Sequence, residues 1–122
     1  MRGNPGPYKA LFSHEEDVTL ANPFFPVVRG WEGVAEALER IASRLRDGEF
    51  FSMIVAKHVG AELACLVQLA HERAKVGGSD ILSPSELRDT MVLRREEGTW
   101  KIVHPHGDPI TIPQPAASVI QQ

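Results

Sequence analysis

The chain is poor in cysteine, in positive charge and in long apolar runs. Cys65 is its one cysteine, so no disulfide can form within the chain. No apolar run approaches the roughly 20 residues that span a bilayer, and the first nine residues show no signal-peptide pattern. The net charge is −3, and the arginines are dispersed among acidic residues. We therefore expect a cytoplasmic protein that has no nucleic acid and no membrane as its main partner.

Sequence motifs of several enzyme classes are missing as well. The chain has no P-loop, no glycine fingerprint for dinucleotides and no G-x-S-x-G elbow. Nucleotide hydrolysis, hydride transfer and serine-hydrolase chemistry therefore have no support. Cys65 lies in an apolar run, which favours core packing over a role as a nucleophile. What the chain does have is an ordinary globular composition, with 43% hydrophobic residues, and a length of 122 residues that suits one core.

The order of the expected elements predicts an α+β domain. Apolar residues recur at helical spacing from Trp31 to Leu45, and Gly48 is the expected stop of that helix. The rest of the chain is rich in β-branched and aromatic residues and predicts four strands joined by hairpin turns, at residues 49–59, 62–76, 86–96 and 99–106. We expect a strongly bent antiparallel sheet wrapped over the helix.

The segment before the helix is expected to be less regular. Residues 8–12 predict the last turn of a short helix, and residues 17–21 predict a short strand. Pro23 and Pro26 predict an irregular connection to the helix, because proline donates no hydrogen bond to a sheet. At the other end, residues 110–122 are expected to form an extended tail beyond the domain.

The last predicted strand carries the most informative side chains. By alternation, one of its faces carries Trp100, Ile102, His104 and His106. A face that starts with Trp and Ile normally faces the core, so we expect His104 and His106 to line the interior, with Asp108 just beyond the strand. Histidines beside a carboxylate form a reasonable acid–base group. The alternative is that they are buried core residues whose hydrogen bonds are simply satisfied.

A metal site is a second alternative for the same residues. A His-x-His pair followed by an aspartate can supply three ligands to one ion. Nothing else in the sequence completes a known metal motif. The sequence therefore assigns no metal.

Two neighbouring predicted strands add candidate residues. In the first, small alanines surround Gln68 and Glu72 on one face, which leaves room for a ligand, although a salt bridge of Glu72 at the sheet margin fits equally well. In the second, Arg88 and Thr90 share a face. If that face points inward, Arg88 could pair with Glu72 or hold a ligand carboxylate; otherwise the arginine is solvated. A slip of one residue in strand register would turn Glu72 and Arg88 outward.

Four phrases follow one another along the chain: Asp17-Val18-Thr19-Leu20, Arg29-Gly30-Trp31-Glu32, Leu87-Arg88-Asp89-Thr90 and the stretch from Gly98 to Asp108. In this order and spacing they resemble the SnoaL-like branch of the NTF2-like superfamily, which includes ketosteroid isomerase-like proteins. The resemblance covers about residues 8–109. It implies that residues 1–109 form a cone-shaped α+β barrel, a curved antiparallel sheet wrapped around helices, with a truncated first helix and a deep apolar pocket.

The resemblance also implies a range of functions. Enzymes of this family include isomerases, dehydratases, polyketide cyclases and epoxide hydrolases, in which a pocket carboxylate or histidine moves a proton without a cofactor. Other members bind ligands or assemble without catalysis, and many form a homodimer through the sheet. For this chain the resemblance implies a pocket for a small apolar carbonyl compound, with acid–base catalysis as one reading. A non-catalytic ligand-binding or dimerisation module is the alternative.

Carried over residue by residue, the resemblance assigns roles to positions of this sequence. His106 or Asp108 is the expected catalytic acid or base, and His104 supports them by hydrogen bonding. Arg88 is expected to orient the ligand. The full set of expected ligand-binding residues is Glu72, Arg88, Thr90, Trp31, Trp100, Phe24 and Phe25.

Overall fold

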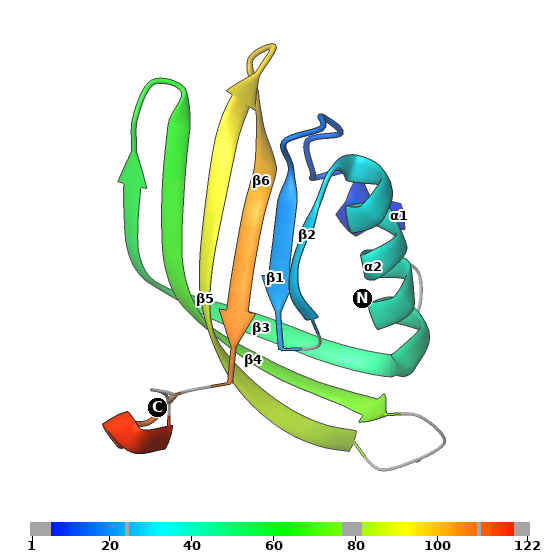
Figure 1. Cartoon of the computed structure of the whole chain (residues 1–122), viewed down its shortest axis with the longest axis vertical. Coiled ribbons are helices and arrows are strands. Elements are labelled where there is room, and N and C mark those ends of the chain that lie inside the picture. The colour runs from blue at the N-terminus through cyan, green and yellow to red at the C-terminus, as the bar shows by residue number, and fades with distance from the viewer. Residues whose placement is uncertain (1–5, 24, 77–81, 110, 119–122) are drawn as a thin grey trace.

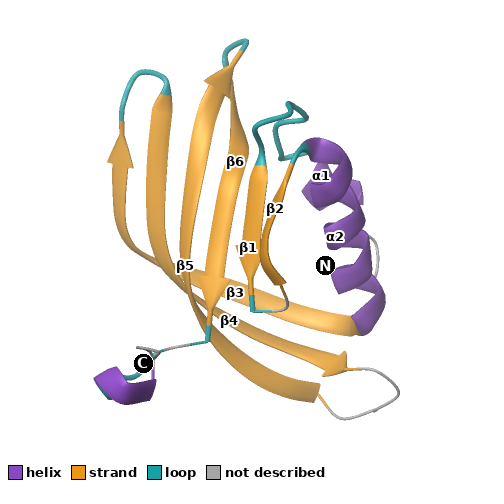
Figure 2. Ribbon diagram, viewed as in Figure 1, coloured by secondary structure: helices purple, strands orange, loops and turns teal. Residues whose placement is uncertain are grey.

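The computed structural model of the protein describes residues 6–23, 25–76, 82–109 and 111–118. A bent sheet has one long helix packed at its side (Figures 1 and 2). In chain order the elements are α1 (Gly6–Lys9), β1 (Thr19–Asn22), β2 (Phe25–Arg29), α2 (Trp31–Arg44), β3 (Leu45–Val59), β4 (Leu63–Val76), β5 (Leu82–Glu96), β6 (Thr99–Asp108) and the 3₁₀ helix η1 (Ala116–Ser118).

All the strands belong to one six-stranded sheet, in the order β2-β1-β6-β5-β4-β3. Neighbouring strands run antiparallel, except that β1 and β6 run parallel and meet at Ala21 and His106. β2 and β3 form the two edges of the sheet. The predicted α+β class and the curved sheet are thus confirmed, while the sheet stays open instead of closing into a complete barrel.

The curvature is concentrated in β3, β4 and β5. Each of these strands bends, so that one part runs toward the end of α2 and the other part runs roughly along the direction of β6, with β5 next to β6 and β3 at the outer edge (Figure 1). The pairing of β3 with β4 is irregular between Arg46 and Glu49 and again between Ile54 and Ala56. Extra residues of this kind bend a strand and increase its twist. The sheet therefore curves toward the side on which α2 lies.

The core lies between α2 and the sheet. Val34 and Leu38 of α2 pack with Leu20 of β1 and Ile102 of β6, and all of them are buried. Each such fully buried aliphatic side chain stabilises the fold by about 1.5–3 kcal/mol. We call the side of the sheet that carries Ile102 the inner face, and the opposite side the outer face.

Helix α2 begins where the sequence predicts and ends earlier. Gly30, just before it, has a φ of 91° and donates its N–H to the carbonyl oxygen of Val18 at 2.7 Å. Such a backbone conformation favours glycine. The helix ends at Arg44, and β3 begins at Leu45. The predicted stop at Gly48 is therefore wrong, because pairing with β4 takes over the backbone before that glycine is reached.

Strand β2 lies where the prolines predicted an irregular connection. It pairs with β1, with Val28 opposite Leu20, and the register shifts between Leu20 and Asn22. β2 is an edge strand, so its other side has no ladder that needs a donor from Pro26. The segment therefore forms a strand, and the predicted irregularity is limited to the extra residue that β2 carries beside Pro26.

The chain around β6 follows the prediction more closely. Glu97 and Gly98, the predicted turn, have φ values of 51° and 78°, as a tight hairpin between twisted strands requires. Past the short helix α1, the backbone runs along β6: Ser13 donates to the carbonyl of Ile102, and Ile102 donates to that of Leu11, both at 2.9 Å. The tail contains η1, so it is not extended throughout.

Candidate functional site

The two faces of β6 exchange their side chains part-way along the strand. Leu93 of β5 pairs with Ile102, but the next residue, Val92, pairs with His104, so Val103 is an extra residue in β6. A bulge of one residue reverses the alternation beyond it. Trp100 and Ile102 therefore lie on the inner face, whereas His104 and His106 lie on the outer face. The prediction that all four share one face is wrong.

On the outer face, His104 is held by β1. Its Nδ1 lies 2.8 Å from the hydroxyl oxygen of Thr19, and its ring centre lies 6.0 Å from that of His106. Burial lowers the pKa of His104, and the neighbouring His106 lowers it further. His104 is therefore a neutral imidazole engaged in a hydrogen bond at neutral pH.

Arg88, Thr90 and Asp108 lie on the same outer face. Thr90 is the register partner of His106, and Arg88 is that of Asp108. Arg88 donates from Nε to Oδ1 of Asp108 at 2.6 Å. The structure thus brings together five of the predicted site residues, but on the face opposite the core. Within this group, Arg88 binds Asp108, and His104 binds Thr19 of β1.

Of the aromatic residues expected to bind a ligand, the structure describes the side chains of Trp31 and Trp100, and each stacks on a different partner. Trp31, at the start of α2, stacks on His14 with 3.8 Å between the ring centres. Trp100, near the start of β6, lies under the guanidinium of Arg95, 4.8 Å from the ring centre. Phe24 lies outside the described residues, as do the side chains of Phe25 and Glu72.

The inner face carries an acid that the sequence analysis did not select. Asp89 of β5 pairs in register with Gln68 of β4, and the Gln68 side-chain amide donates to Oδ2 of Asp89 at 2.7 Å. Gln68 is only 7% exposed, and Ala70, two residues along the same face, is buried as well. On β5, Asp89 lies between Leu87 and Met91 in the alternation of the strand. A single carboxyl group and its amide partner therefore interrupt an otherwise apolar strip.

The surroundings of Asp89 change its acidity. Burial raises the pKa of this carboxyl, and the hydrogen bond from Gln68 and the charge of His106 offset the rise only in part. A half-buried carboxyl whose neutral form is favoured can donate a proton or a hydrogen bond, and its ionised form is a stronger base than a solvated aspartate. Among the described inner-face residues, Asp89 has the environment expected of an acid–base group.

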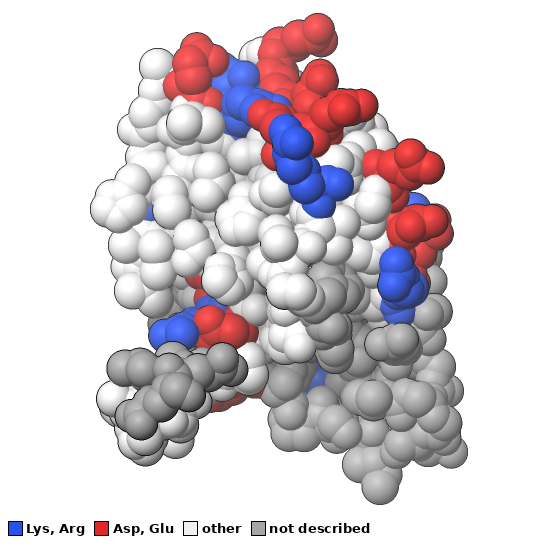
Figure 3. All heavy atoms as spheres, viewed as in Figure 1, with Lys and Arg blue, Asp and Glu red and all other residues white. Residues whose placement is uncertain are grey.

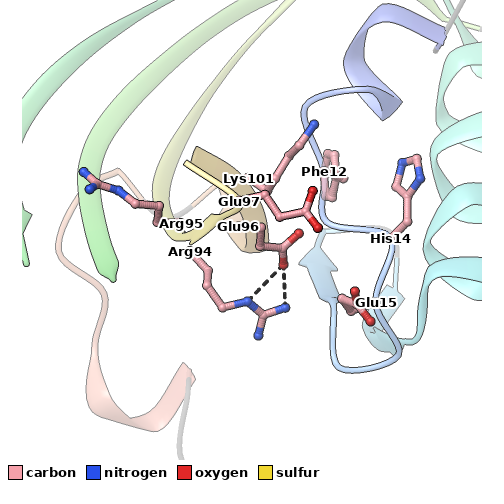
Figure 4. A pocket seen from close by; sticks show the side chains of 8 residues that line it. All are labelled: Phe12, His14, Glu15, Arg94, Arg95, Glu96, Glu97 and Lys101. Atoms are coloured by element: carbon pink, nitrogen blue, oxygen red, sulfur yellow. Dashed lines mark hydrogen bonds and ion pairs between the residues drawn. The ribbon is translucent and has the colours of Figure 1, made fainter. Parts of the chain in front are cut away.

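A separate cavity of about 580 Å³ opens at the end of the β5–β6 hairpin (Figure 4). Two of the side chains that line it, Arg94 and Glu96, bind one another. Arg94 binds the carboxylate of Asp17 and that of Glu96, and Ser13 donates to Glu96 at 2.7 Å. Arg94 thereby lowers the pKa of Asp17, and Ser13 with Arg94 lowers that of Glu96. This network ties the loop before β1 to the hairpin.

No group of three or more His, Cys, Asp or Glu side chains in the described part of the chain is placed to hold a metal ion. No helix there is both long enough and apolar enough to cross a membrane.

The fold can now be compared with known proteins. A family model described as a SnoaL-like domain matches residues 2–112. The chain belongs to the SnoaL-like domain family. None of the curated proteins compared with it matches.

Several solved structures share the fold of this SnoaL-like protein. An NTF2-like superfamily protein from Salmonella enterica is 19% identical, with a TM-score of 0.78 over 93% of this chain and 82% of that one. A proposed dehydratase of the NTF2-like family from Streptomyces avermitilis is 20% identical, with a TM-score of 0.77 over 90% and 84%. A ketosteroid isomerase-like protein from Erwinia carotovora atroseptica is 15% identical, with a TM-score of 0.76 over 90% and 84%. At these identities the likeness shows the fold.

The family prediction is confirmed, but the selection of site residues missed Asp89. A signal for it was present in the sequence, because Leu87, Met91 and Leu93 form an apolar set in alternation with Arg88 and Thr90. The apolar set is the better candidate for the inner face, and Asp89 is its one charged member. The SnoaL-like sheet thus carries a single acid among apolar neighbours on β5, and the predicted histidines on the reverse side.

Proposed function

We propose that this SnoaL-like protein binds a small apolar carbonyl compound against the inner face of its sheet and that Asp89 exchanges a proton with it. The observation that carries the proposal is the carboxyl group of Asp89, held through Oδ2 by the buried Gln68 amide among apolar neighbours. Burial raises the pKa of Asp89, which makes its carboxylate a stronger base than that of a solvated aspartate. The names of two similar structures, an isomerase-like protein and a proposed dehydratase, agree with proton transfer of this kind.

The reaction class follows from what one carboxyl group can do. As a carboxylate, Asp89 takes a proton from the carbon next to the carbonyl, and the electron pair moves onto the carbonyl oxygen to give an enolate. Asp89, now neutral, returns the proton to the same or to a conjugated carbon. The sequence of steps needs no oxidant or reductant. Apolar side chains around the acid exclude water, which strengthens its interaction with the ligand.

Exchange of deuterium into a ketone tests the proposal. Cyclohexanone is incubated with the protein in D₂O, and proton NMR follows the loss of signal from the carbons next to the carbonyl. We expect the wild-type protein to accelerate exchange and Asp89→Asn to lose at least about tenfold of that acceleration, since one positioned acid–base group contributes about 10²–10⁴-fold. Glu86→Gln is the matched control, because it removes an exposed carboxylate from the outer face of the same strand. Equal exchange by the wild type and Asp89→Asn would contradict the proposal.

The outer face supports a second function, the assembly of a homodimer through the sheet. Phe51 and Met53 of β3 are 64% and 56% exposed, and they pair with His71 and Leu69 of β4 on this face. Figure 3 shows a broad surface over β4, β5 and β6 with few charged side chains, while the charges gather near the β5–β6 hairpin and along α2. A second copy of the chain is the occupant that such an uncharged face suits, because its own apolar patch is self-complementary.

Analytical ultracentrifugation distinguishes a monomer from a homodimer. We expect the wild type to sediment as a dimer of the 13.5 kDa chain and Met53→Asp to sediment as a monomer. Ile54→Asp is the matched control. Ile54 is the adjacent residue and is similarly exposed, at 52%, but it pairs with Gln68 and so lies on the inner face. A monomeric wild type at tens of micromolar would remove the dimer from the proposal.

A further inference from the structure

Position 107 leaves a space beside the carboxyl group of Asp89. Gly107 of β6 is the register partner of Asp89. A Cβ placed on Gly107 would lie 3.7 Å from Oδ1 of Asp89 and 3.8 Å from Cδ1 of Leu87. Both are ordinary contact distances, so the backbone at Gly107 could carry a side chain. Since it carries none, Oδ1 of Asp89 borders the volume that a Cβ would occupy.

The other carboxyl oxygen of Asp89, Oδ2, is already occupied by a hydrogen bond. Oδ2 of Asp89 accepts the hydrogen bond of Gln68 at 2.7 Å. An amide N–H needs an acceptor, so a neutral Asp89 keeps Oδ2 as its carbonyl-like oxygen and carries its proton on Oδ1. Gln68 thus makes the two oxygens of Asp89 inequivalent and turns the reactive one toward Gly107.

The walls of this space are apolar. Pro105 precedes Gly107 by two residues on the inner face and is buried, with Met91 as its register partner. Leu87 lies on the other side of Asp89 along β5. A ligand whose C–H next to the carbonyl reaches Oδ1 must therefore have apolar flanks and be thin enough to lie against a backbone without a side chain.

We propose that Gly107 determines which ligands reach Asp89, by leaving room over Oδ1 for the carbon next to a flat carbonyl group, and that Gln68 is the residue that positions Asp89 for this contact. The inference rests on the proposed function, in which Asp89 is the group that exchanges the proton. It adds the identity of the reactive oxygen and the residue that limits ligand size. Gly107 acts through the space it leaves, and Gln68 acts through Asp89.

A titration of Asp89 tests the geometry without any ligand. Carbon-13 NMR of the carboxyl carbons gives the pKa of Asp89, assigned by the loss of its signal in Asp89→Asn. We expect Gly107→Val to raise this pKa by about 0.5 or more, because the added side chain displaces water from Oδ1, and Gly107→Ala to raise it less. Gln68→Leu should raise it as well, since the hydrogen bond that stabilises the carboxylate is lost. Thr99→Val is the control, because it also introduces a valine on β6, at an exposed position. It should leave the pKa of Asp89 unchanged.

The same variants are then compared in cyclohexanone exchange. We expect Gly107→Val to lose at least about tenfold of the wild-type acceleration, as substitutions that misplace or block a reacting group do. An unchanged Asp89 pKa in Gly107→Val would show that Oδ1 does not face position 107 and would overturn the inference. An exchange rate in Gly107→Val equal to that of the wild type would also overturn the inference. If the pKa rises as expected but the wild type does not accelerate exchange, the proposed function fails while the geometry stands. Thermal unfolding of each variant verifies that it is folded.

Discussion

Arg94 donates one hydrogen bond from each of its terminal nitrogens to the carboxylate of Asp17, at 2.6 and 3.0 Å. The two residues are far apart in the sequence, so this contact fixes the loop before β1 against the end of β5. The same guanidinium binds Glu96 at 2.8 Å. Paired, bidentate contacts of this kind are stronger than a single surface ion pair.

Replacement of Arg94 by Met should destabilise the fold in a pH-dependent way. The pKa values of Asp17 and Glu96 are lowered in the folded protein, Asp17 by Arg94 and Glu96 by Ser13 and Arg94. Lowered carboxyl pKa values stabilise the fold above the unfolded-state pKa, about 4, and that stabilisation is lost as the pH falls through the folded-state pKa. We expect Arg94→Met to cost about 1 kcal/mol in urea unfolding at pH 7, and the cost to shrink below about pH 4.

The neighbouring arginine supplies the control for that experiment. Arg95 lies over the ring of Trp100. Arg95→Met should therefore change the unfolding free energy by an amount that varies little between pH 5 and pH 3. A constant cost of Arg94→Met over the same range would show that the carboxylates of Asp17 and Glu96 do not depend on Arg94.

Asp89→Asn should stabilise the fold at neutral pH. A raised carboxyl pKa means that the folded state binds more protons than the unfolded state between the two pKa values, so stability falls as the pH rises through that window. Asn keeps an oxygen that can accept the Gln68 hydrogen bond and carries no charge to bury. In urea unfolding we expect the variant to exceed the wild type at pH 7 and to match it below about pH 4, where Asp89 is protonated in both states. Asp108→Asn, which loses its contact with Arg88, should show no such gain. A destabilised Asp89→Asn at pH 7 would contradict the assignment.

His104 should make the free energy of unfolding depend on pH between pH 5 and pH 7, above the range in which the carboxyl groups titrate. Its pKa is lowered in the fold, first by burial and then by His106. A lowered histidine pKa stabilises the fold above the unfolded-state value, about 6.5, and this contribution is lost as the pH falls through the folded-state pKa. The unfolding free energy of the wild type should therefore fall more steeply between pH 7 and pH 5 than that of His104→Gln. His58→Gln, at an exposed position on β3, should retain the wild-type slope. Parallel curves for the wild type and His104→Gln would remove His104 as the cause.

Deletion of Val103 should turn the outer-face histidines toward the core. With the extra residue gone, strict alternation from Ile102 would place His104 and His106 on the inner face. Each buried polar group without a partner costs about 1–3 kcal/mol, so the unfolding free energy should fall by about 2 kcal/mol or more. Urea unfolding measures the loss. Replacement of Val103 by Ala, which keeps the chain length, is the control and should cost less.

The comparison of sequence and structure separates local from long-range information. The periodicity that predicts α2 and the turn at Glu97 and Gly98 depends on neighbouring residues only, and both are confirmed. The bulge at Val103 depends on which residue of β5 lies opposite each residue of β6, and no local pattern in β6 specifies that pairing. β2 forms despite Pro26 because it lies at an edge, a position that the sequence does not reveal.

The same distinction explains the candidate site. Alternation counted from Trp100 predicts that His104 and His106 face the core, and the one extra residue at Val103 reverses their direction. Asp89 lies inward because Leu87, Met91 and Leu93 do, so the apolar members of a strand predicted its faces better than the conspicuous polar ones. Its partner Gln68 lies on another strand, and only the register of β4 against β5 brings the two together.

The extra residue at Val103 also affects how this chain is aligned with its relatives. A SnoaL-like protein whose last strand lacks the bulge needs a one-residue gap at this position. Without the gap, every later residue would be matched to one on the opposite side of the sheet, and a catalytic role would be copied onto the wrong surface. Residues beyond Val103 are therefore better matched by their partners across the strand, Val92, Thr90 and Arg88, than by their distance from Trp100.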